Sequence, residues 1–324
     1  MLEKMIEILR KNPRKIVFPE GTDARILDAA AHLKKEGFLT PVLIGKEANV
    51  EAEAKKAGQD ISGIEIVNPD NFPDFQKMVA KMVELRHGKM DEETCRANLK
   101  KSNYFGTMYV QMGYADALLG GATYSTADTV RPALQLVKCK PGHRIVTSCF
   151  ILHRPDGKGG EEMYAMGDCA ININPDEDQL VEIAQGTAET ARTFGMEPKV
   201  AFLSYSTKGS GKGDSVTAMS NATQKLQALH PDYDVDGELQ FDSAISPEVA
   251  TLKAPGSKVA GRANVFIFPD INAGNIGYKI AQRLGKFEAL GPVMAGLNAP
   301  INDLSRGCNA EEVYKMAIIT AALK

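Results

Sequence analysis

Short apolar stretches of strand length alternate with helical segments from residue 15 to residue 121, and this alternation limits the possible folds. Residues 15–19 and 41–45 are short and apolar, as buried strands are. A helical segment that ends at Gly37 separates them. Strands separated by helices pair in parallel when helices cover both faces of the sheet. The order therefore predicts an α/β fold with mostly parallel sheets covered by helices on both faces.

The pattern changes after about residue 140, and this change predicts a second domain. The segments expected there are a hairpin over 144–153 and 162–173, a helix over 175–194, and buried strands at 199–204 and 263–269. We expect domain I to comprise residues 1–141 and 299–324, and domain II to comprise residues 142–298. The final helix, over 311–323, thereby returns to domain I.

The composition is that of an ordinary enzyme and argues against several other classes. Hydrophobic residues make up 44% and charged residues 24% of the 324 residues. A net charge of −3 without a basic tail argues against general binding of nucleic acid. No apolar run approaches the roughly 18 residues that span a bilayer, and the N-terminal segment lacks the apolar core of a signal peptide. We therefore expect a cytoplasmic protein that binds neither membrane nor nucleic acid.

The cysteines and histidines show no pattern of a metal site. The five cysteines are odd in number and have no CxxC spacing, which argues against a disulfide framework and a zinc site. The five histidines are scattered, without an i,i+4 pair or an HExxH motif. We therefore expect no metal.

Residues 291–307 are too rich in Gly, Pro and Asn for an ordinary amphipathic helix, and they place Ser305 beside Arg306. A guanidinium beside a small hydroxyl suits a phosphate or a developing oxyanion. The next residues begin a helix, with Asn309 as N-cap and Glu312 as its capping-box partner. The N-terminus of this helix adds free N–H groups to the same neighbourhood. The alternative is a crossover loop whose arginine meets solvent.

A second candidate anion site follows the strand at 117–121. Ser125, Thr126 and Arg131 are natural phosphate contacts, although capping of a helix explains the hydroxyls equally well. Ligands of open α/β sheets gather at the carboxyl ends of strands, which favours anion binding here.

Three further loops carry groups that could meet a ligand. Residues 204–215 lack the glycine spacing of a P-loop, but their small residues and hydroxyls could converge on an oxyanion. The alternative there is a flexible, solvated loop. In the polar turn at 269–277, Asn272 could hold a ligand or satisfy backbone groups, and in the loop at 19–25, Arg25 faces either a cleft or solvent.

These motifs, in this order, resemble those of the phosphate acetyl/butyryltransferase family. The resemblance is carried by Pro19-Glu20 with Arg25, residues 120–132, residues 204–210, residues 268–279 and residues 302–307. It implies the two-domain architecture of isocitrate/isopropylmalate dehydrogenase-like enzymes, a homodimer, and an active site in the interdomain cleft. It also implies that acetyl-CoA and phosphate are interconverted with CoA and acetyl phosphate, with coenzyme A as a substrate and no tightly bound cofactor.

The resemblance also implies roles for individual residues. The CoA thiolate attacks acetyl phosphate directly in a ternary complex, since the thiolate is the nucleophile. Arg306 polarises the carbonyl and stabilises its oxyanion, and Ser305 orients the thiol or the phosphate. Glu312 matches the position of the family's proton acceptor, where members often carry Asp, and its capping role competes with that assignment. The implied substrate contacts are Arg86 and Arg131 for phosphate or CoA, and Ser125, Ser206 and Thr207 for acetyl phosphate.

Three alternative functions are less consistent with the motifs. Phosphate butyryl transfer differs only in room for a longer acyl chain. A nicotinamide-dependent decarboxylating dehydrogenase needs an aspartate set for a divalent metal, and no such cluster occurs in the sequence. A non-catalytic two-domain binding protein would bind a ligand without turnover.

Overall fold

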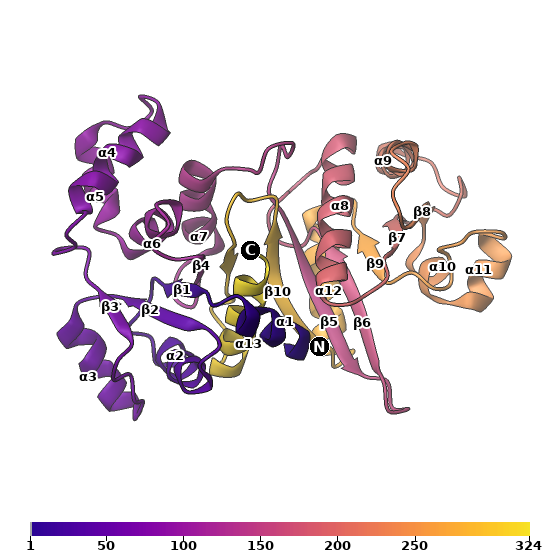
Figure 1. Cartoon of the computed structure of the whole chain (residues 1–324). Helices are drawn as coiled ribbons and strands as arrows, with labels where there is room; N and C mark the ends of the chain where they lie inside the picture. The colour runs from indigo at the N-terminus through magenta and orange to yellow at the C-terminus, as the bar shows by residue number, and fades with distance from the viewer. Residues whose placement is uncertain (1) are drawn as a thin grey trace. The chain divides into compact units, whose positions relative to one another are not determined.

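The structure is a computed structural model that describes residues 2–324. It divides into two compact units, Met1–Pro141 with Leu297–Lys324 (unit 1) and Gly142–Gly296 (unit 2). Figure 1 shows the elements of both units. The expected domains, 1–141 with 299–324 and 142–298, and the expected site between them stay predictions.

Unit 1 is built on a five-stranded sheet in the order β11-β4-β1-β2-β3, and every neighbouring pair is parallel. The strands are β1 (Lys15–Phe18), β2 (Thr40–Ile44), β3 (Glu65–Val67), β4 (Ala117–Gly120) and β11 (Ile301–Asp303). The expected parallel sheet is therefore confirmed. Because β11, β4 and β1 are neighbours, the loops that follow them emerge at one edge.

Helices surround this sheet. They are α1 (Leu2–Lys11), α2 (Ala24–Glu36), α3 (Glu47–Ala57), α4 (Phe75–Arg86), α5 (Glu92–Leu99), α6 (Ser102–Gln111), α7 (Thr126–Pro132), the π-helical turn η1 (Ala133–Val137) and α13 (Ala310–Ala322). The sequence analysis did not predict α6, because Tyr104 to Val110 are all buried and leave no polar face for a helical pattern.

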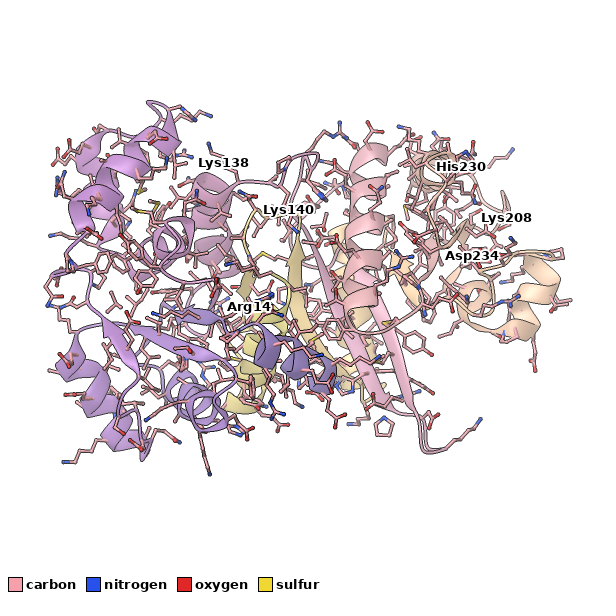
Figure 2. The ribbon with its side chains drawn as sticks, viewed as in Figure 1. Arg14, Lys138, Lys140, Lys208, His230 and Asp234 are labelled. Carbon is pink, nitrogen blue, oxygen red and sulfur yellow. The ribbon has the colours of Figure 1, made fainter. Side chains whose placement is uncertain are left out.

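The C-terminal helix α13 joins unit 1 through its largely apolar surface. It packs against α1, α2 and β4. Tyr314 stacks on His32 of α2, with ring centroids 4.2 Å apart. Arg14, labelled in Figure 2, donates hydrogen bonds to the backbone carbonyls of Ala321 and Lys324. These contacts fix the helix whose first turn carries Glu312.

Unit 2 contains a six-stranded sheet in the order β10-β5-β6-β9-β7-β8. Its strands are β5 (Thr147–Pro155), β6 (Glu161–Gly167), β7 (Lys199–Leu203), β8 (Asp234–Leu239), β9 (Val265–Ile267) and β10 (Glu288–Ala295). The expected hairpin is confirmed as the antiparallel pair β5–β6, and β6, β9, β7 and β8 run parallel. Residues 291–295 belong to β10, antiparallel to β5, although the sequence did not predict a strand in this segment. A register shift between Leu290 and Val293 accommodates Gly291-Pro292 in this strand.

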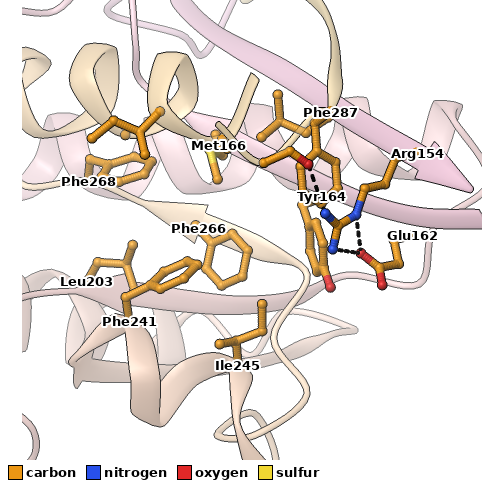
Figure 3. Close-up of a pocket in the computed structure, with 15 residues that line it drawn as sticks. Arg154, Glu162, Tyr164, Met166, Leu203, Phe241, Ile245, Phe266, Phe268 and Phe287 are labelled. Atoms are coloured by element: carbon orange, nitrogen blue, oxygen red, sulfur yellow. Dashed lines mark hydrogen bonds and ion pairs between the residues drawn. The ribbon is translucent and has the colours of Figure 1, made fainter. Parts of the chain in front are cut away.

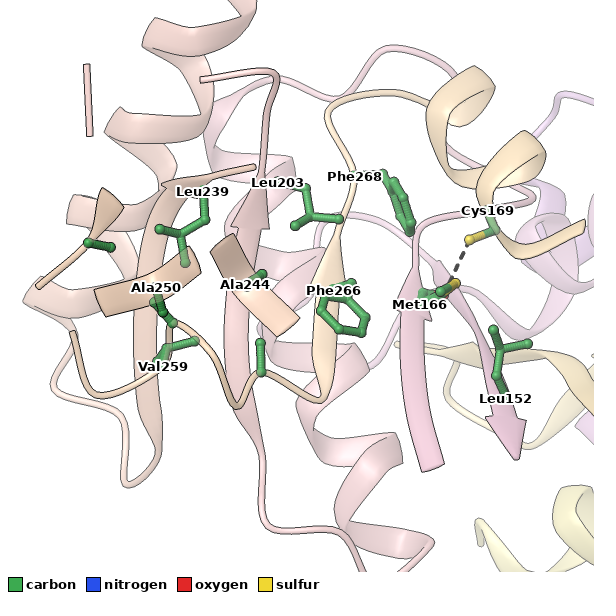
Figure 4. Close-up of a cluster of buried hydrophobic side chains, with 14 of the residues drawn as sticks. Leu152, Met166, Cys169, Leu203, Leu239, Ala244, Ala250, Val259, Phe266 and Phe268 are labelled. Atoms are coloured by element: carbon green, nitrogen blue, oxygen red, sulfur yellow. Dashed lines mark hydrogen bonds between the residues drawn. The ribbon is translucent and has the colours of Figure 1, made fainter. Parts of the chain in front are cut away.

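Five helices accompany this sheet: α8 (Glu177–Thr193), α9 (Asp214–Ala228), α10 (Phe241–Ile245), α11 (Pro247–Lys253) and α12 (Ile271–Arg283). Figure 4 shows the core on one face, where Phe266 and Leu203 of the sheet meet Ala244 of α10 and Ala250 of α11. Helices α8 and α9 pack against the sheet without joining this cluster, as expected of the opposite face. The mixed α/β fold with mostly parallel sheets is confirmed.

Candidate active site

The loops that follow β1, β4 and β11 form the candidate site of unit 1. These three strands are adjacent and parallel, so their carboxyl ends lie at the same edge of the sheet. The edge therefore brings together residues 19–25, 121–126 and 304–308, which belong to or directly follow the segments 19–25, 120–132 and 291–307 singled out in the sequence.

The carboxylate of Glu20 accepts hydrogen bonds from the backbone N–H groups of the loop that follows β4. Its Oε2 accepts hydrogen bonds from the N–H groups of Gly121 at 2.8 Å and Ala122 at 3.1 Å. Its Oε1 accepts from the Thr123 hydroxyl at 2.6 Å, from the Thr123 N–H and from the N–H of Tyr124 at 3.3 Å. Backbone donors that converge in this way suit an oxyanion, and here a buried carboxylate of the chain itself takes that place.

Ser125 and Thr126 are also engaged within the chain. Ser125 is the N-cap of α7, and its hydroxyl donates to Asp128 Oδ2 at 2.6 Å. The Thr126 hydroxyl donates to Asp303 Oδ2 at 2.7 Å. The capping interpretation of Ser125 is thus confirmed, whereas phosphate binding by either hydroxyl stays a prediction.

Asp303, the last residue of β11, is an almost fully buried carboxyl at this edge. It is 1% exposed, and its Oδ1 has no hydrogen-bond partner among residues 2–324. Burial, together with the nearby charge of Glu20, raises the pKa of Asp303 to about 6, against the lowering effect of the Thr126 hydrogen bond. A side chain at Gly121 would lie within 2.7 Å of both backbone polar atoms of Leu304, so only glycine fits beside this carboxyl.

Arg25 links the same three segments from the first turn of α2. Its guanidinium donates to the carbonyl oxygens of Arg306 at 2.9 Å, Cys308 at 3.0 Å and Ala122 at 2.8 Å. It also forms two hydrogen bonds with the carboxylate of Asp23, at 3.0 and 2.8 Å. These bonds to Asp23 raise the pKa of Arg25 above its ordinary value, so the guanidinium stays charged.

Ser305 and Arg306 lie in an exposed turn after β11. The Ser305 carbonyl accepts from the N–H of Cys308 at 2.9 Å, and its hydroxyl accepts from the N–H of Gly307 at 3.3 Å. The guanidinium of Arg306 forms no hydrogen bond or ion pair with any residue from 2 to 324. Arg306 therefore presents a full set of guanidinium donors beside the Ser305 hydroxyl.

Glu312 closes the first turn of α13. The N–H of Asn309 donates to Glu312 Oε2 at 3.1 Å, and the N–H of Glu312 donates to Asn309 Oδ1 at 2.9 Å. The predicted capping box is confirmed. The proton-accepting role of Glu312 stays a prediction, because a carboxylate can keep this cap through one oxygen and receive a proton on the other.

Arg86 and Arg131 offer further cationic groups in unit 1. Arg86 donates to the carbonyl of Gln135 in η1 at 3.3 Å, and its buried Nε has no acceptor in the part of the chain that the structure describes. Gln135 is held in turn by the hydroxyl of Tyr104, which donates to its side-chain oxygen at 2.9 Å. Arg131 is exposed in the last turn of α7. Binding of phosphate or CoA by these arginines stays a prediction.

Ser206 and Thr207, after β7 in unit 2, are buried. The Ser206 hydroxyl donates to Glu238 Oε1 at 2.8 Å and accepts from the N–H of Gly211 at 2.8 Å. The Thr207 hydroxyl accepts from the N–H of Gln240 at 3.0 Å. Both side chains therefore fix the loop after β7 to the end of β8, and contact with acetyl phosphate stays a prediction.

Asn272 lies exposed in the first turn of α12, where its N–H donates to the N-cap Asp270 at 2.8 Å. The neighbouring Asn275 donates its side-chain amide to the carbonyl of Cys169 at 3.0 Å. This polar turn thus satisfies backbone groups, and a ligand at Asn272 stays a prediction.

Unit 2 also contains an apolar pocket of about 510 Å³ (Figure 3). The polar groups labelled at its rim are Arg154, which pairs with Glu162 at 2.8 Å and lies 4.2 Å from the ring centroid of Phe287, and the Tyr164 hydroxyl. Because its cation is already paired and most of its lining is hydrocarbon, this pocket is poorly suited to phosphate.

No set of three or more His, Cys, Asp and Glu side chains within residues 2–324 is arranged to hold a metal ion. Within the same residues, no helix has the length and apolar character needed to cross a membrane.

A sequence model described as Phosphate acetyl/butaryl transferase matches residues 1–321. The chain belongs to this family. The Phosphate acetyltransferase of Bacillus subtilis (strain 168) is 52% identical over 308 residues, which cover 95% of this chain and 94% of that protein. The crystal structure of a phosphotransacetylase from Streptococcus pyogenes is 51% identical, with a TM-score of 0.94 and coverage of 99% of this chain and 97% of that one.

The fold of this family member is also shared with a more distant structure. A Salmonella typhimurium protein designated a 4-hydroxythreonine-4-phosphate dehydrogenase is 14% identical, with a TM-score of 0.50 over 95% of this chain and 99% of that one. This likeness confirms the expected dehydrogenase-like architecture and concerns the fold alone.

The sequence alone suggested no role for Glu20, Asp23 or Asp303, although all three lie in segments discussed above, 19–25 and 302–307. For Glu20 and Asp303, the available signal was an acidic residue at or just after the end of a strand, near a glycine-rich loop at the same sheet edge.

Proposed function

We propose that this transferase catalyses acetyl-CoA + phosphate = CoA + acetyl phosphate. The observation that carries the proposal is the 52% identity, over 95% of the chain, to a protein named Phosphate acetyltransferase. The unpaired guanidinium of Arg306 beside the Ser305 hydroxyl supports it, because the reaction requires a donor for a phosphate or an oxyanion.

In this proposal Arg306 polarises the acetyl carbonyl and stabilises the tetrahedral oxyanion that forms on it. A well-placed donor of this kind lowers the barrier by roughly 3–4 kcal/mol. Ser305 orients the thiol or the phosphate. Arg86, Arg131, Ser125, Thr126, Ser206, Thr207 and Asn272 remain candidate substrate contacts.

The thiol of CoA must lose its proton to attack acetyl phosphate, and we assign this proton to the carboxylate of Glu312. The sulfur forms a bond to the acetyl carbon, the bond from that carbon to the phosphate oxygen breaks, and phosphate leaves with the electron pair. The proton can then pass from Glu312 to the departing phosphate, so neither a covalent acyl-enzyme nor a tightly bound cofactor is required.

We also place the protein in the cytoplasm as a homodimer. The four buried cysteines, Cys95, Cys149, Cys169 and Cys308, form no disulfide bond, as is usual in a reducing compartment. Ile276, Ile280 and Leu284 form an exposed apolar stripe along α12 and its C-cap, spaced four residues apart on one helical face. An apolar stripe of this kind is typical of a surface that a second subunit covers.

A spectrophotometric assay of thioester formation from CoA tests the proposed function. We expect turnover with acetyl phosphate, slower turnover with butyryl phosphate, and no loss of activity with a chelator. Faster turnover with butyryl phosphate would instead identify a butyryltransferase. Absence of thioester with acetyl, propionyl and butyryl donors would contradict the acyltransferase assignment.

A further inference from the structure

The guanidinium of Arg25 has all its donors engaged within unit 1. Arginine carries five N–H groups. Nε–H and one Nη2–H of Arg25 are directed to Asp23, and the other Nη2–H is directed to the carbonyl of Ala122. The two Nη1–H groups are directed to the carbonyls of Arg306 and Cys308. No donor is left for a phosphate or a pyrophosphate group.

The two carbonyls that Nη1 reaches flank Gly307, so Arg25 holds the turn of Arg306 on both sides. The third carbonyl, of Ala122, belongs to the loop whose N–H groups are held by Glu20. The stretch from the end of β1 to the first turn of α2 therefore supplies the carboxylate of Glu20 to the donors of one loop and the guanidinium of Arg25 to the acceptors of both loops. Such bonds to a charged group are stronger than neutral ones.

This arrangement contrasts with that of Arg306. The side chain of Arg25 is 28% exposed and fully bonded. The guanidinium of Arg306 has no partner among residues 2–324, while its own backbone carbonyl is the acceptor for Arg25. Arg25 is thus held through its guanidinium, whereas Arg306 is held only through its backbone carbonyl.

We propose that Arg25 is a positioning residue that aims Arg306 by holding the 306–308 turn, and that it does not bind substrate. The proposal rests on the proposed acyltransferase function. Since misplacing a reacting group by about 1 Å can cost 10²-fold in rate, loss of this support should reduce kcat. It should leave the KM values for CoA and acetyl phosphate nearly unchanged.

The test compares kcat and KM for Arg25→Gln, Arg25→Lys and Asp23→Asn with those of the wild-type chain. We expect kcat to fall roughly 10–100-fold in Arg25→Gln. It should fall less in Arg25→Lys, which keeps the positive charge but lacks the planar guanidinium with its several N–H donors. Asp23→Asn keeps the N-cap of α2, because Asn caps as well as Asp, but removes the carboxylate that orients Arg25. We expect kcat of Asp23→Asn to fall as well, but by less than kcat of Arg25→Gln.

Arg96→Gln is the matched control, because Arg96 is an arginine of unit 1 that bonds to Gln76 and Glu92 away from this edge. It should retain wild-type kinetics. Guanidinium ion added to Arg25→Ala should recover part of kcat, which a merely destabilised fold would not allow.

Two results would overturn the proposal. One is a KM for CoA or acetyl phosphate that rises more than about tenfold at unchanged kcat in Arg25→Gln, as expected of a residue that binds substrate. The other is wild-type kinetics in both Arg25→Gln and Asp23→Asn. If Arg25→Gln does not fold, a wild-type kcat in Asp23→Asn alone would contradict the positioning role of Arg25. Failure of the proposed function is distinct, since the wild-type chain itself would then form no thioester.

Discussion

Glu312 combines two roles that a single substitution can separate. Its carboxylate accepts the Asn309 N–H in the capping box, and we assign it the proton of the CoA thiol. Glu312→Gln keeps the cap, because a glutamine oxygen accepts the same hydrogen bond, but it cannot take the proton. We expect kcat to fall roughly 10²–10⁴-fold with a change of less than about 0.5 kcal/mol in the free energy of unfolding.

Steady-state kinetics and urea unfolding of the same preparation measure both effects. Asn309→Ala provides the complementary control, since it removes the cap, keeps the carboxylate and should cost about 1 kcal/mol of stability. Wild-type turnover in Glu312→Gln would mean that another group receives the proton.

Asp303 makes the stability of the chain depend on pH. Its pKa of about 6 in the folded protein lies above the ordinary value of 3.8. The folded state therefore binds the proton more tightly than the unfolded chain. This contribution to the free energy of unfolding is fully present below about pH 4, declines as the pH rises to about 6, and is lost above it, a change of roughly 3 kcal/mol.

Asp303→Asn isolates this effect, because the amide oxygen can still accept from Thr126 while the charge is removed. We expect the variant to be more stable than wild type at pH 8, with the difference shrinking towards pH 4.5. Denaturant unfolding at several pH values measures it. Stability curves that run parallel across this range would show that Asp303 does not titrate as described.

Among single residues, the sequence predicted those whose chemistry is evident from residue type, such as Ser305, Arg306 and the Asn309–Glu312 box. It could not reveal that Glu20 fills the donors of the loop after β4. That contact joins residues about a hundred positions apart and depends on the strand order. Arg25 was an open question for the same reason, since its acceptors are backbone carbonyls, which carry no sequence signal.

At the scale of elements, the carboxyl end of β1 supports the loop that follows β4. Glu20→Ala would leave several N–H groups of residues 121–124 without an acceptor in a largely buried site. Because an orphaned buried donor costs about 1–3 kcal/mol, we expect a loss of roughly 2–4 kcal/mol in stability. Thermal unfolding measures this loss, with the exposed Glu36→Ala of α2 as control. Equal melting temperatures for both variants would contradict this description of the loop.

The elements themselves were predicted where periodicity or capping was clear, as for β1, β2 and β4 of unit 1, the β5–β6 hairpin and α8. Helix α6 was missed because burial on all sides removes the amphipathic pattern. Strand β10 was missed because Gly291 and Pro292 interrupt the strand signal, and the register shift that accommodates them forms only against β5.

At the scale of the whole molecule, the apolar stripe on unit 2 leads to a prediction about assembly. Leu284 is 79% exposed at the C-cap of α12, in line with Ile276 and Ile280. Leu284→Glu should weaken the proposed homodimer, because a charge buried without a partner is costly. We expect light scattering coupled to size exclusion to show a dimer for wild type and monomer for the variant.

Leu229→Glu is the control for this experiment, since Leu229 is similarly exposed but lies at the end of α9, outside the stripe. It should remain dimeric. A monomeric wild-type chain, or a Leu284→Glu variant as dimeric as wild type, would contradict the assignment of this surface.

The whole-chain architecture was predictable because the βα alternation and the ordered motifs extend across most of the sequence, and the family match over residues 1–321 agrees with them. The bonding state of the site was not predictable. It depends on which arginines have hydrogen-bond partners within the chain. Those partners are brought within reach only when the ends of β1, β4 and β11 lie side by side in the folded sheet.

In the proposed reaction, the turn of Ser305 and Arg306 is the catalytic centre, so the decisive measurement is kcat of Arg306→Gln for thioester formation. Because the guanidinium forms no hydrogen bond or ion pair with any residue from 2 to 324, the variant should unfold as wild type does. We predict a loss of roughly 10²–10³-fold in kcat, the effect of removing one oxyanion donor. A folded Arg306→Gln chain with near wild-type turnover would contradict the account.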